Sequence, residues 1–367
     1  MTKKAKRTER KKSKIFHISR SSLGIDVSKS TIHCTLVVQD VNFRRKVLFS
    51  KKFANTLKGF EELNERITKS LGEGNRPDIV VMEATGVYYE NVAYYLYKNG
   101  FTVVVELPQR IKSFAQSIGT KTKTDKVDSK VIAFYGLSNS MEDLTVWRPV
   151  SKKYSEMKSL LRYRIKIKKR LTQLKNRLHA LNHSYQPSKD VIRLIKREIK
   201  FQEIILEIVE KKIEKLVKQD RELSRKIAKI ETIKSVGFWT AVTVVIEYNG
   251  FILAKNRNQV VSFAGLDVVE NQSGQHQGKS KISKQGNKFV RSVLYMSSLS
   301  AFRYNPVLKD FYDRLIDKGK NKAQARSAVV RKTLIYIYTI WKTDKSFDPN
   351  YAKNQMQQRS VDISAAA

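Results

Sequence analysis

The chain has 367 residues and a mass of 42.4 kDa, enough for two or three domains of about 150 residues each. Its 72 Lys and Arg residues against 34 Asp and Glu residues give a net charge of +38. A content of 41% hydrophobic and 10% aromatic residues excludes a wholly disordered chain. We therefore expect a folded protein that binds a polyanion.

Residues 1–20 are dominated by Lys and Arg and predict a disordered basic arm. An α/β domain is expected over 21–147, because runs with strand and helix patterns alternate there. The expected elements are a β-hairpin from the runs at 23–38 and 46–53, strands at 78–82 and 101–107, and helices at 87–98 and 125–135.

Residues 151–230 have a different period, with apolar residues repeating every three or four positions. The first run extends from Met157 to Leu181 and is apolar at every seam position but Arg164. After a break at 185–187, a second run extends from Ile195 to Ile230, interrupted only at Gln202 and Asp220. Two such helices joined by a short turn predict an antiparallel coiled-coil hairpin.

Residues 231–344 predict a second globular domain, mainly α-helical, and 345–367 a loose polar tail. The stretch 233–241, with Gly237 at its centre, is similar to the turn of a helix-hairpin-helix element, which can hold a phosphate through backbone N–H groups. Basic side chains on the first long helix and in the C-terminal domain are candidate contacts to nucleic acid: Arg162, Lys166, Lys169, Arg170, Lys281, Lys284 and Arg291.

Four carboxylates are placed where a sheet edge and a helix meet. Asp26 and Glu83 stand at the carboxyl ends of two predicted strands, where open α/β sheets usually hold ligands. Asp125 and Asp128 are three residues apart and share one helix face. Alone, each has an ordinary reading as a cap or surface residue; together they predict a site for Mg²⁺ or Mn²⁺ and phosphoryl transfer.

Other metal chemistry and membrane insertion are not expected. Cys34 is the single cysteine, which excludes an internal disulfide and a cysteine zinc cluster, and the five His residues lack ligand spacing. No run approaches the ~18 apolar residues of a spanning helix, and no apolar signal core is present at the N-terminus. We expect a cytoplasmic protein without membrane contact.

Ser273 is a candidate nucleophile, because it lies beside a glycine in a loop rich in Lys and Arg. Nearby cations favour an alkoxide and stabilise charge on an attacked phosphate. The pattern permits this role without requiring it, since Ser-Gly is far more often a simple turn. No His or Asp has the spacing that assigns a Ser-His-Asp triad.

In their order, these motifs resemble the transposases of the insertion-sequence family numbered one hundred and ten, the DEDD transposases or bridge-RNA-guided recombinases. The resemblance covers nearly the whole chain. It rests on Gly-Ile-Asp-Val-Ser at 24–28, Met-Glu-Ala-Thr-Gly at 82–86 and Lys-Thr-Asp-Lys-Val-Asp at 123–128, then Val-Gly-Phe-Trp-Thr-Ala, Phe-Ala-Gly-Leu, Gln-Ser-Gly, Ile-Ser-Lys-Gln-Gly-Asn and Val-Arg-Ser-Val-Leu. The segment after Ser273 departs from the family, because Gln275-His276-Gln277 replaces a glycine-rich stretch; His276 is either a DNA or proton contact or, more simply, a loop residue.

The resemblance implies a RuvC-like (RNase H-like) N-terminal domain in which Asp26, Glu83, Asp125 and Asp128 hold magnesium, and a C-terminal transposase domain whose Ser273 forms a phosphoserine link to DNA. It also implies donor and target DNA, an element-encoded bridge RNA, dimers or tetramers, and a place at the bacterial or archaeal nucleoid. Two alternatives remain open: a DNA invertase of the same fold, related to pilin-gene inversion enzymes, and a RuvC-like nuclease without a covalent step.

Overall fold

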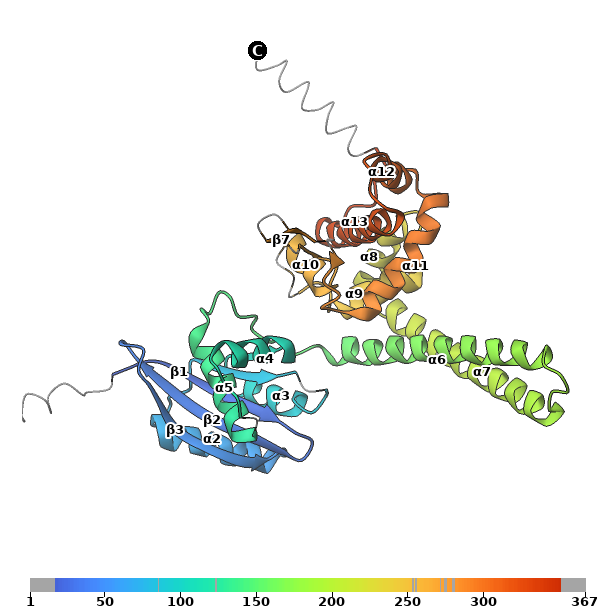
Figure 1. Ribbon diagram of the computed structural model, residues 1–367. Helices are drawn as coiled ribbons and strands as arrows, with labels where there is room; N and C mark the ends of the chain where they lie inside the picture. Colours follow the sequence, from blue (N-terminus) through green and yellow to red (C-terminus); the bar gives the residue numbers. More distant parts are fainter. Residues whose placement is uncertain are drawn as a thin grey trace, which may run out of the picture. The chain divides into compact units, whose positions relative to one another are not determined.

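The computed structural model describes residues 17–350 except 85, 123, 253, 255, 271, 274, 275, 279 and 280, with only the backbone of 276 and 277. The chain divides between Pro149 and Val150 into two compact units, each with its own apolar core (Figure 1). Most of the expected basic arm and of the expected tail lie outside the described residues. Where the arm is described, it is partly structured, because Ile18 to Arg20 already belong to the first strand.

A five-stranded sheet forms the first unit, with order β3-β2-β1-β4-β5. Its first three strands form an antiparallel meander, one strand more than the expected hairpin, while β4 and β5 run parallel to β1. The α/β class predicted for this unit is confirmed. The strands are β1 (Ile18–Val27), β2 (Thr31–Asp40), β3 (Arg45–Ala54), β4 (Ile79–Glu83) and β5 (Val103–Glu106).

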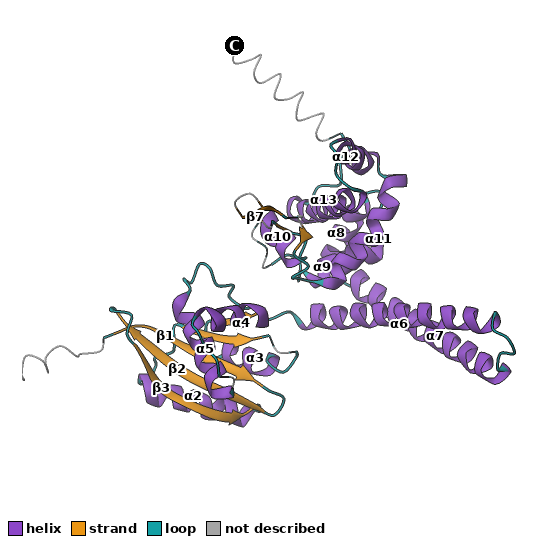
Figure 2. Ribbon diagram, in the orientation of Figure 1, coloured by secondary structure: helices purple, strands orange, loops and turns teal. Residues whose placement is uncertain are grey.

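Helices cover both faces of this sheet (Figure 2). On one face, Phe60 and Leu63 of α2 and Leu96 of α3 share a core with β1. On the other face, α5 packs across β1, β2 and β4, and α4 packs beside α5. The helices are α2 (Leu57–Leu71), α3 (Glu90–Lys98), α4 (Pro108–Ser117) and α5 (Asp125–Ser138).

Gly24 allows α5 to lie directly on the backbone of β1. A Cβ atom at Gly24 would stand 2.1 Å from the carbonyl oxygen of Ser129 and 2.3 Å from the backbone nitrogen of Ala133. Beside this contact, the hydroxyls of Thr35 and Ser129 hydrogen-bond at 2.7 Å. Any side chain at position 24 would push the helix away from the strand.

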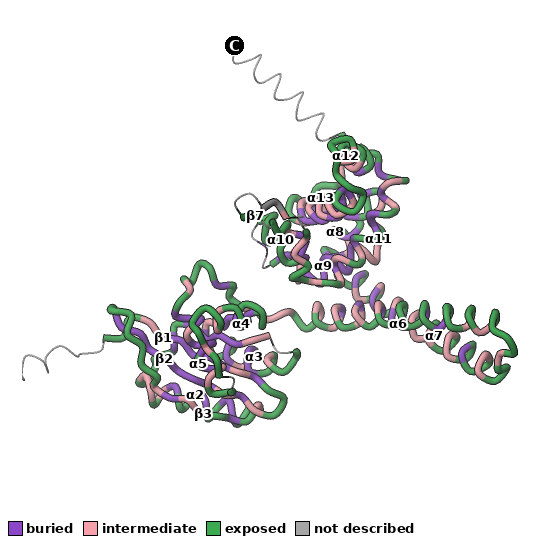
Figure 3. The backbone as a smooth tube through the Cα atoms, viewed as in Figure 1, coloured by how far each residue is buried: buried purple, intermediate pink, exposed green. Residues whose placement is uncertain are grey.

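The second unit is mostly helical. Its main core joins the near ends of two long helices, Met157 and Leu161 of α6 and Val217 of α7, to five shorter helices, while the far end of the pair is largely exposed (Figure 3). None of the described helices is long and apolar enough to span a membrane. The helices are α6 (Lys152–Asn182), α7 (Lys189–Lys218), α8 (Arg221–Glu231), α9 (Phe238–Glu247), α10 (Arg257–Phe263), α11 (Lys288–Tyr304), α12 (Pro306–Asp317) and α13 (Lys322–Thr343).

The two long helices pair in antiparallel fashion. Ion pairs join Glu156 to Lys212 and Arg170 to Glu198, each at 2.7 Å, so residue numbers rise along α6 as they fall along α7. Arg164, the charged residue of the predicted seam, is buried. It donates to Glu210 at 2.7 Å and lies 3.8 Å from the centre of the Trp239 ring. Its charge is therefore paired inside the seam.

The prediction of one continuous second helix to Ile230 is wrong, because α7 ends at Lys218 and α8 begins at Arg221. Asp220 stands between them with an extended backbone, and its side chain accepts a hydrogen bond from the Leu223 N–H. A carboxylate in this position satisfies an otherwise unpaired N–H group at a helix start. The interruption at Asp220 is thus a helix boundary.

Replacing Gly24 by Ala tests the close contact between strand and helix. We expect Gly24→Ala to lower the free energy of unfolding by about 1–3 kcal/mol, the usual cost of an inserted methyl group in a packed interior. Differential scanning calorimetry of the full chain measures the change. Gly237→Ala is the matched control, because a Cβ there would meet nothing within 4 Å, and it should cost at most about 1 kcal/mol as an N-cap change. Equal losses in both variants would contradict this account.

Candidate functional site: a carboxylate cluster and a serine ribbon

Two of the candidate carboxylates meet at one edge of the sheet. The strands β1 and β4 are parallel, and Ile25 is in register with Met82. The next residues, Asp26 and Glu83, therefore lie side by side at the carboxyl ends of their strands, as the sequence predicted. Both side chains are only partly buried.

The other two carboxylates come from the start of α5. Asp125 and Asp128 occupy its first turn, which begins where the Thr124 side chain accepts a hydrogen bond from the Val127 N–H. Because Gly24 seats α5 on β1 just one turn later, this end of the helix comes close to Asp26. A helix N-terminus also stabilises negative charge, which favours acidic residues there.

The pKa of Asp26 reflects this proximity. Burial, together with the negative charges of Asp128, Asp125 and Glu83, raises the pKa of Asp26 to about 6. Asp26 is therefore near enough to the other three candidates for each of their charges to act on it. Like charges held together favour either a shared proton or a bound cation.

The cluster fits a divalent cation by donor type and by charge. Oxygen ligands of this kind suit Mg²⁺ or Mn²⁺. Among the described residues, however, no three His, Cys, Asp or Glu side chains already stand close enough to hold one ion together. Lys52 lies 3.8 Å from Asp125, a long and exposed ion pair that contributes little.

His33 and Lys52 lie beside this cluster, and the sequence did not single them out. His33 is the register partner of Asp26 on β2, and Lys52 is the partner of His33 on β3. Burial lowers the pKa of His33, which also hydrogen-bonds Ser50 at 3.1 Å. Asp26, His33 and Lys52 are neighbours across three strands, which only the strand register reveals. Predicting that register requires the strand ends to be known.

Ser273 lies in a narrow β-ribbon of the second unit, and its side chain is exposed. The outer pair of strands is in register at Ser273 and His276, and the inner pair joins Val268 to Ile282. The ribbon strands are β6 (Val268–Val269), β7 (Gln272–Ser273), β8 (His276–Gln277) and β9 (Lys281–Ile282).

Tight backbone contacts close the base of this ribbon. A Cβ atom at Gly286 would stand 2.5 Å from both the Gly265 nitrogen and the Phe263 carbonyl oxygen, so only glycine fits. Gly265 itself has a φ of +64°, a conformation that glycine adopts without strain. Arg291 adds a 2.7 Å hydrogen bond to the carbonyl of Ala264.

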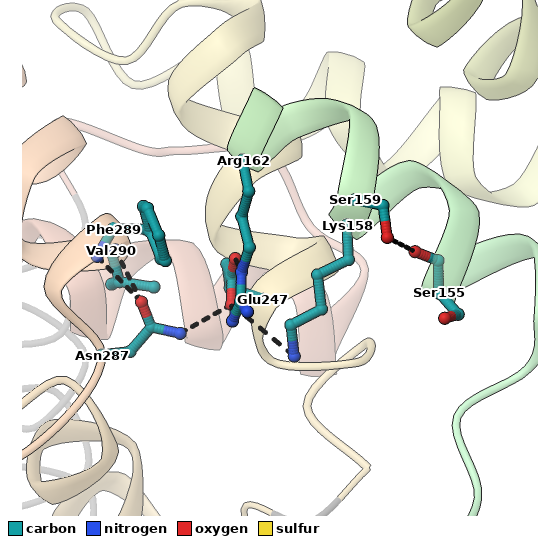
Figure 4. A network of polar contacts seen from close by, with 8 residues as sticks. All are labelled: Ser155, Lys158, Ser159, Arg162, Glu247, Asn287, Phe289 and Val290. Atoms are coloured by element: carbon teal, nitrogen blue, oxygen red, sulfur yellow. Dashed lines mark hydrogen bonds and ion pairs between the residues drawn. The ribbon is translucent and has the colours of Figure 1, made fainter. Parts of the chain in front are cut away.

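The predicted nucleic-acid contacts fall into two groups. Some already have partners within the second unit: Arg162 binds the buried Glu247, Arg170 binds Glu198, and Arg291 binds the backbone, as Figure 4 shows for Arg162. The others have exposed side chains, and no ion pair to them is found within the described residues: Lys166, Lys169, Lys281 and Lys284. The exposed group is better placed to contact phosphates.

Two family models match the chain. One, described as a transposase of the IS110 group, matches residues 23–187, and one described as "Transposase IS116/IS110/IS902 family" matches residues 227–313. Two similar proteins are the pilin gene-inverting proteins of Moraxella bovis and Moraxella lacunata. Each is 27% identical over 333 residues, covering 90% of this chain and 98% of the relative.

Among solved structures, RuvC of Thermus thermophilus in complex with a Holliday junction substrate is 12% identical, with a TM-score of 0.24 over 32% of this chain and 96% of that one. The yeast mitochondrial Holliday junction resolvase is 15% identical, with a TM-score of 0.23 over 33% of this chain and 80% of that one.

Asp26→Asn tests the charge crowding. A folded pKa near 6, above the ordinary 3.8, means that the folded state holds its proton longer than the unfolded chain does. Without divalent cations, stability therefore falls as pH rises from about 4 to 7. The variant should lose this dependence and gain about 1 kcal/mol at pH 7, a figure reduced for partial exposure.

Thermal unfolding in EDTA between pH 4 and 7 measures both effects. Asp143→Asn, in the exposed 140–143 turn of the same unit, is the matched control and should keep the wild-type pH dependence. A less stable Asp26→Asn protein at pH 7 would show that the four charges do not repel one another.

Proposed function

Because the chain belongs to the IS116/IS110/IS902 family of transposases and is a DNA-recombining enzyme, we propose that it cleaves and exchanges DNA strands through a phosphoserine intermediate on Ser273. Its first unit is then a RuvC-like nuclease domain, and its second unit carries the nucleophile. The observation that supports this best is that β1, β4 and α5 bring Asp26, Glu83, Asp125 and Asp128 to one sheet edge, where the other three charges act on Asp26.

In this proposal, Asp26, Glu83, Asp125 and Asp128 hold Mg²⁺, with Mn²⁺ as a substitute. The mutual repulsion that raises the pKa of Asp26 supports it, since a cation relieves that repulsion. When bound, such ions stabilise charge on a scissile phosphate and on the oxygen that leaves it. The chain's own part would be to hold the start of α5 beside the end of β1, and the contact of α5 with Gly24 supports this.

In the serine step, one phosphorus–oxygen bond forms for each one that breaks. The Oγ–P bond forms as the bond from phosphorus to one sugar oxygen breaks; Ser273 gives up its hydroxyl proton and the released sugar hydroxyl gains one. Attack by a sugar hydroxyl of the partner strand then reverses this chemistry and frees the serine. The exposure of Ser273 supports access to DNA, and the exposed Lys281 and Lys284 of the same ribbon carry positive charge that attracts phosphates.

Guidance by an element-encoded bridge RNA accounts for the charge of the chain. With a net charge of +38, the protein can bind the phosphates of RNA together with donor and target DNA. Phosphate contacts position nucleic acid without choosing its sequence, which base pairing with an RNA would supply. Two or four copies would assemble on these substrates, at the nucleoid in the cytoplasm, with the carboxylates of one copy meeting the serine of another.

DNA inversion is the second candidate, because the two Moraxella relatives are named as pilin gene-inverting proteins and match over 90% of this chain. Inversion uses the same residues and the same covalent step. The DNA beside the gene distinguishes the two, since an insertion sequence should border a non-coding region that folds into RNA loops. A nuclease that releases free ends, without a protein adduct, is the third candidate.

Ser273→Ala should abolish a covalent protein–DNA adduct while the protein stays folded. Purified protein is incubated with Mg²⁺, flank RNA and labelled DNA, then run on a denaturing gel before and after protease. Ser262→Ala, an exposed serine on α10, is the control and should form wild-type amounts of adduct. An adduct that persists in Ser273→Ala would remove this serine from the mechanism, and free ends without any adduct would favour the nuclease.

Omitting the flank RNA from the same reaction should reduce adduct formation to background. An unrelated RNA of equal length is the control, because it offers the same charge without pairing to the DNA. Equal adduct yields with flank RNA, unrelated RNA and no RNA would exclude guidance and leave recognition to the protein.

A further inference from the structure

A buried polar network connects the base of the Ser273 ribbon to the helices of the second unit (Figure 4). Its centre is Glu247, the last residue of α9, whose side chain is 1% exposed. Arg162 of α6 donates two hydrogen bonds to it, at 2.7 and 2.9 Å, and the Lys158 ammonium lies 3.6 Å away. The Asn287 side-chain amide donates a further hydrogen bond at 2.7 Å.

Asn287 combines three tasks at the point where the ribbon enters α11. Its backbone N–H donates to the Phe263 carbonyl at 2.8 Å, which closes the base of the ribbon. Its Oδ1 accepts hydrogen bonds from the N–H groups of Phe289 and Val290, which caps α11. Its Nδ2 reaches Glu247. One residue, through its backbone and its side chain, thus ties the ribbon, α11 and α9 together.

The ribbon has further bonds at its base, among them the hydrogen bond from the Arg291 guanidinium of α11 to the Ala264 carbonyl at 2.7 Å. The Ser283 hydroxyl donates to the Asp267 carboxylate at 2.7 Å, and the Lys284 N–H donates to the Gly265 carbonyl at 3.1 Å. These bonds hold the two sides of the ribbon to each other. Among the described residues, the bond from Asn287 to Glu247 is the one that joins the base to a buried charge.

A buried carboxylate is costly unless every bond to it is made. Burial raises the pKa of Glu247, but the hydrogen bonds and charges of Arg162, Lys158 and Asn287 outweigh this and hold the pKa below its usual value. Glu247 is therefore a charged, fully engaged group with little freedom to move. Such a group is a suitable fixed point for a narrow ribbon.

We propose that Glu247 and Asn287 are positioning residues that hold the ribbon in the orientation in which Ser273 reacts. The inference deepens the proposed function and rests on Ser273 as nucleophile. The anchoring of the ribbon itself is independent of any DNA chemistry, so the two can be tested apart.

The test compares Asn287→Asp and Asn287→Ser with the wild type in the full chain. Both substitutions keep a side chain that caps a helix, but Ser cannot reach Glu247 and Asp repels it. Asn321→Asp is the matched control, because Asn321 caps α13 and makes no bond to the ribbon base. Hydrogen exchange of the Ser283 and Lys284 amides measures anchoring, and the rate of adduct formation with saturating DNA measures positioning.

In both Asn287 variants we expect the ribbon amides to exchange roughly tenfold faster, while those of α9 and α13 keep their protection. The adduct should form about 10- to 100-fold more slowly at unchanged DNA affinity, the effect of a displaced reacting group. The control variant should match the wild type in both measurements.

A double variant, Glu247→Gln with Asn287→Ser, separates positioning from general damage. Oε2 of Glu247 accepts hydrogen bonds from both Arg162 and Asn287, so Glu247→Gln and Asn287→Ser weaken the same contact, and the double variant should lose less adduct rate than the product of the two single losses. Losses that multiply fully in the double variant would argue against a specific contact.

Two results would overturn the proposal. Unchanged exchange at Ser283 and Lys284 in the Asn287 variants would show that the ribbon does not depend on this anchor. Faster exchange with a wild-type adduct rate would show that the anchor does not position Ser273. If the wild type forms no adduct, the proposed function fails, and the exchange experiment still decides whether Glu247 and Asn287 hold the ribbon.

Discussion

The contact between Gly24 and the backbone of α5 is the constraint on which the first unit depends. It lets a helix lie on β1 without an intervening side chain, and it brings the two aspartates of the first turn of α5 near Asp26. The crowding of negative charge is then a consequence of packing. Because packing holds these like charges close to Asp26, binding a cation or a proton at the site stabilises the folded protein.

Much of the fold was predictable because the spacing of apolar residues along the chain is regular. The alternation of strand and helix runs identified the α/β unit, and the heptad spacing identified the long helix pair up to Lys218. Two helices, α2 and α4, were not anticipated, although Phe60, Leu63 and Ile67 of α2 have helical spacing. Asp220 was misjudged because an acid within an apolar period has the same pattern whether it interrupts a seam or caps a new helix.

The carboxylates of the candidate site were also predictable, since strand ends and the i, i+3 spacing are local signals. Contacts that depend on tertiary placement were not. His33 and Lys52 reach the cluster through strand register, and Asn287 meets Glu247 across 40 residues of chain. Arg162 had the pattern of a surface cation, yet a buried carboxylate on another helix engages it.

Arg164 has a consequence for the mechanics of the long helix pair. Its guanidinium pairs with Glu210 of α7 and lies over the ring of Trp239 of α9, so both the alignment of the long helices and their placement on α9 bear on this charge. A heptad shift that brings Val217 to the place of Glu210 would leave a buried charge without its partner, an alignment error that purely apolar seams tolerate far better. The buried charge therefore favours the observed alignment of the pair, which fixes how far the tip of the hairpin extends beyond the core at its base.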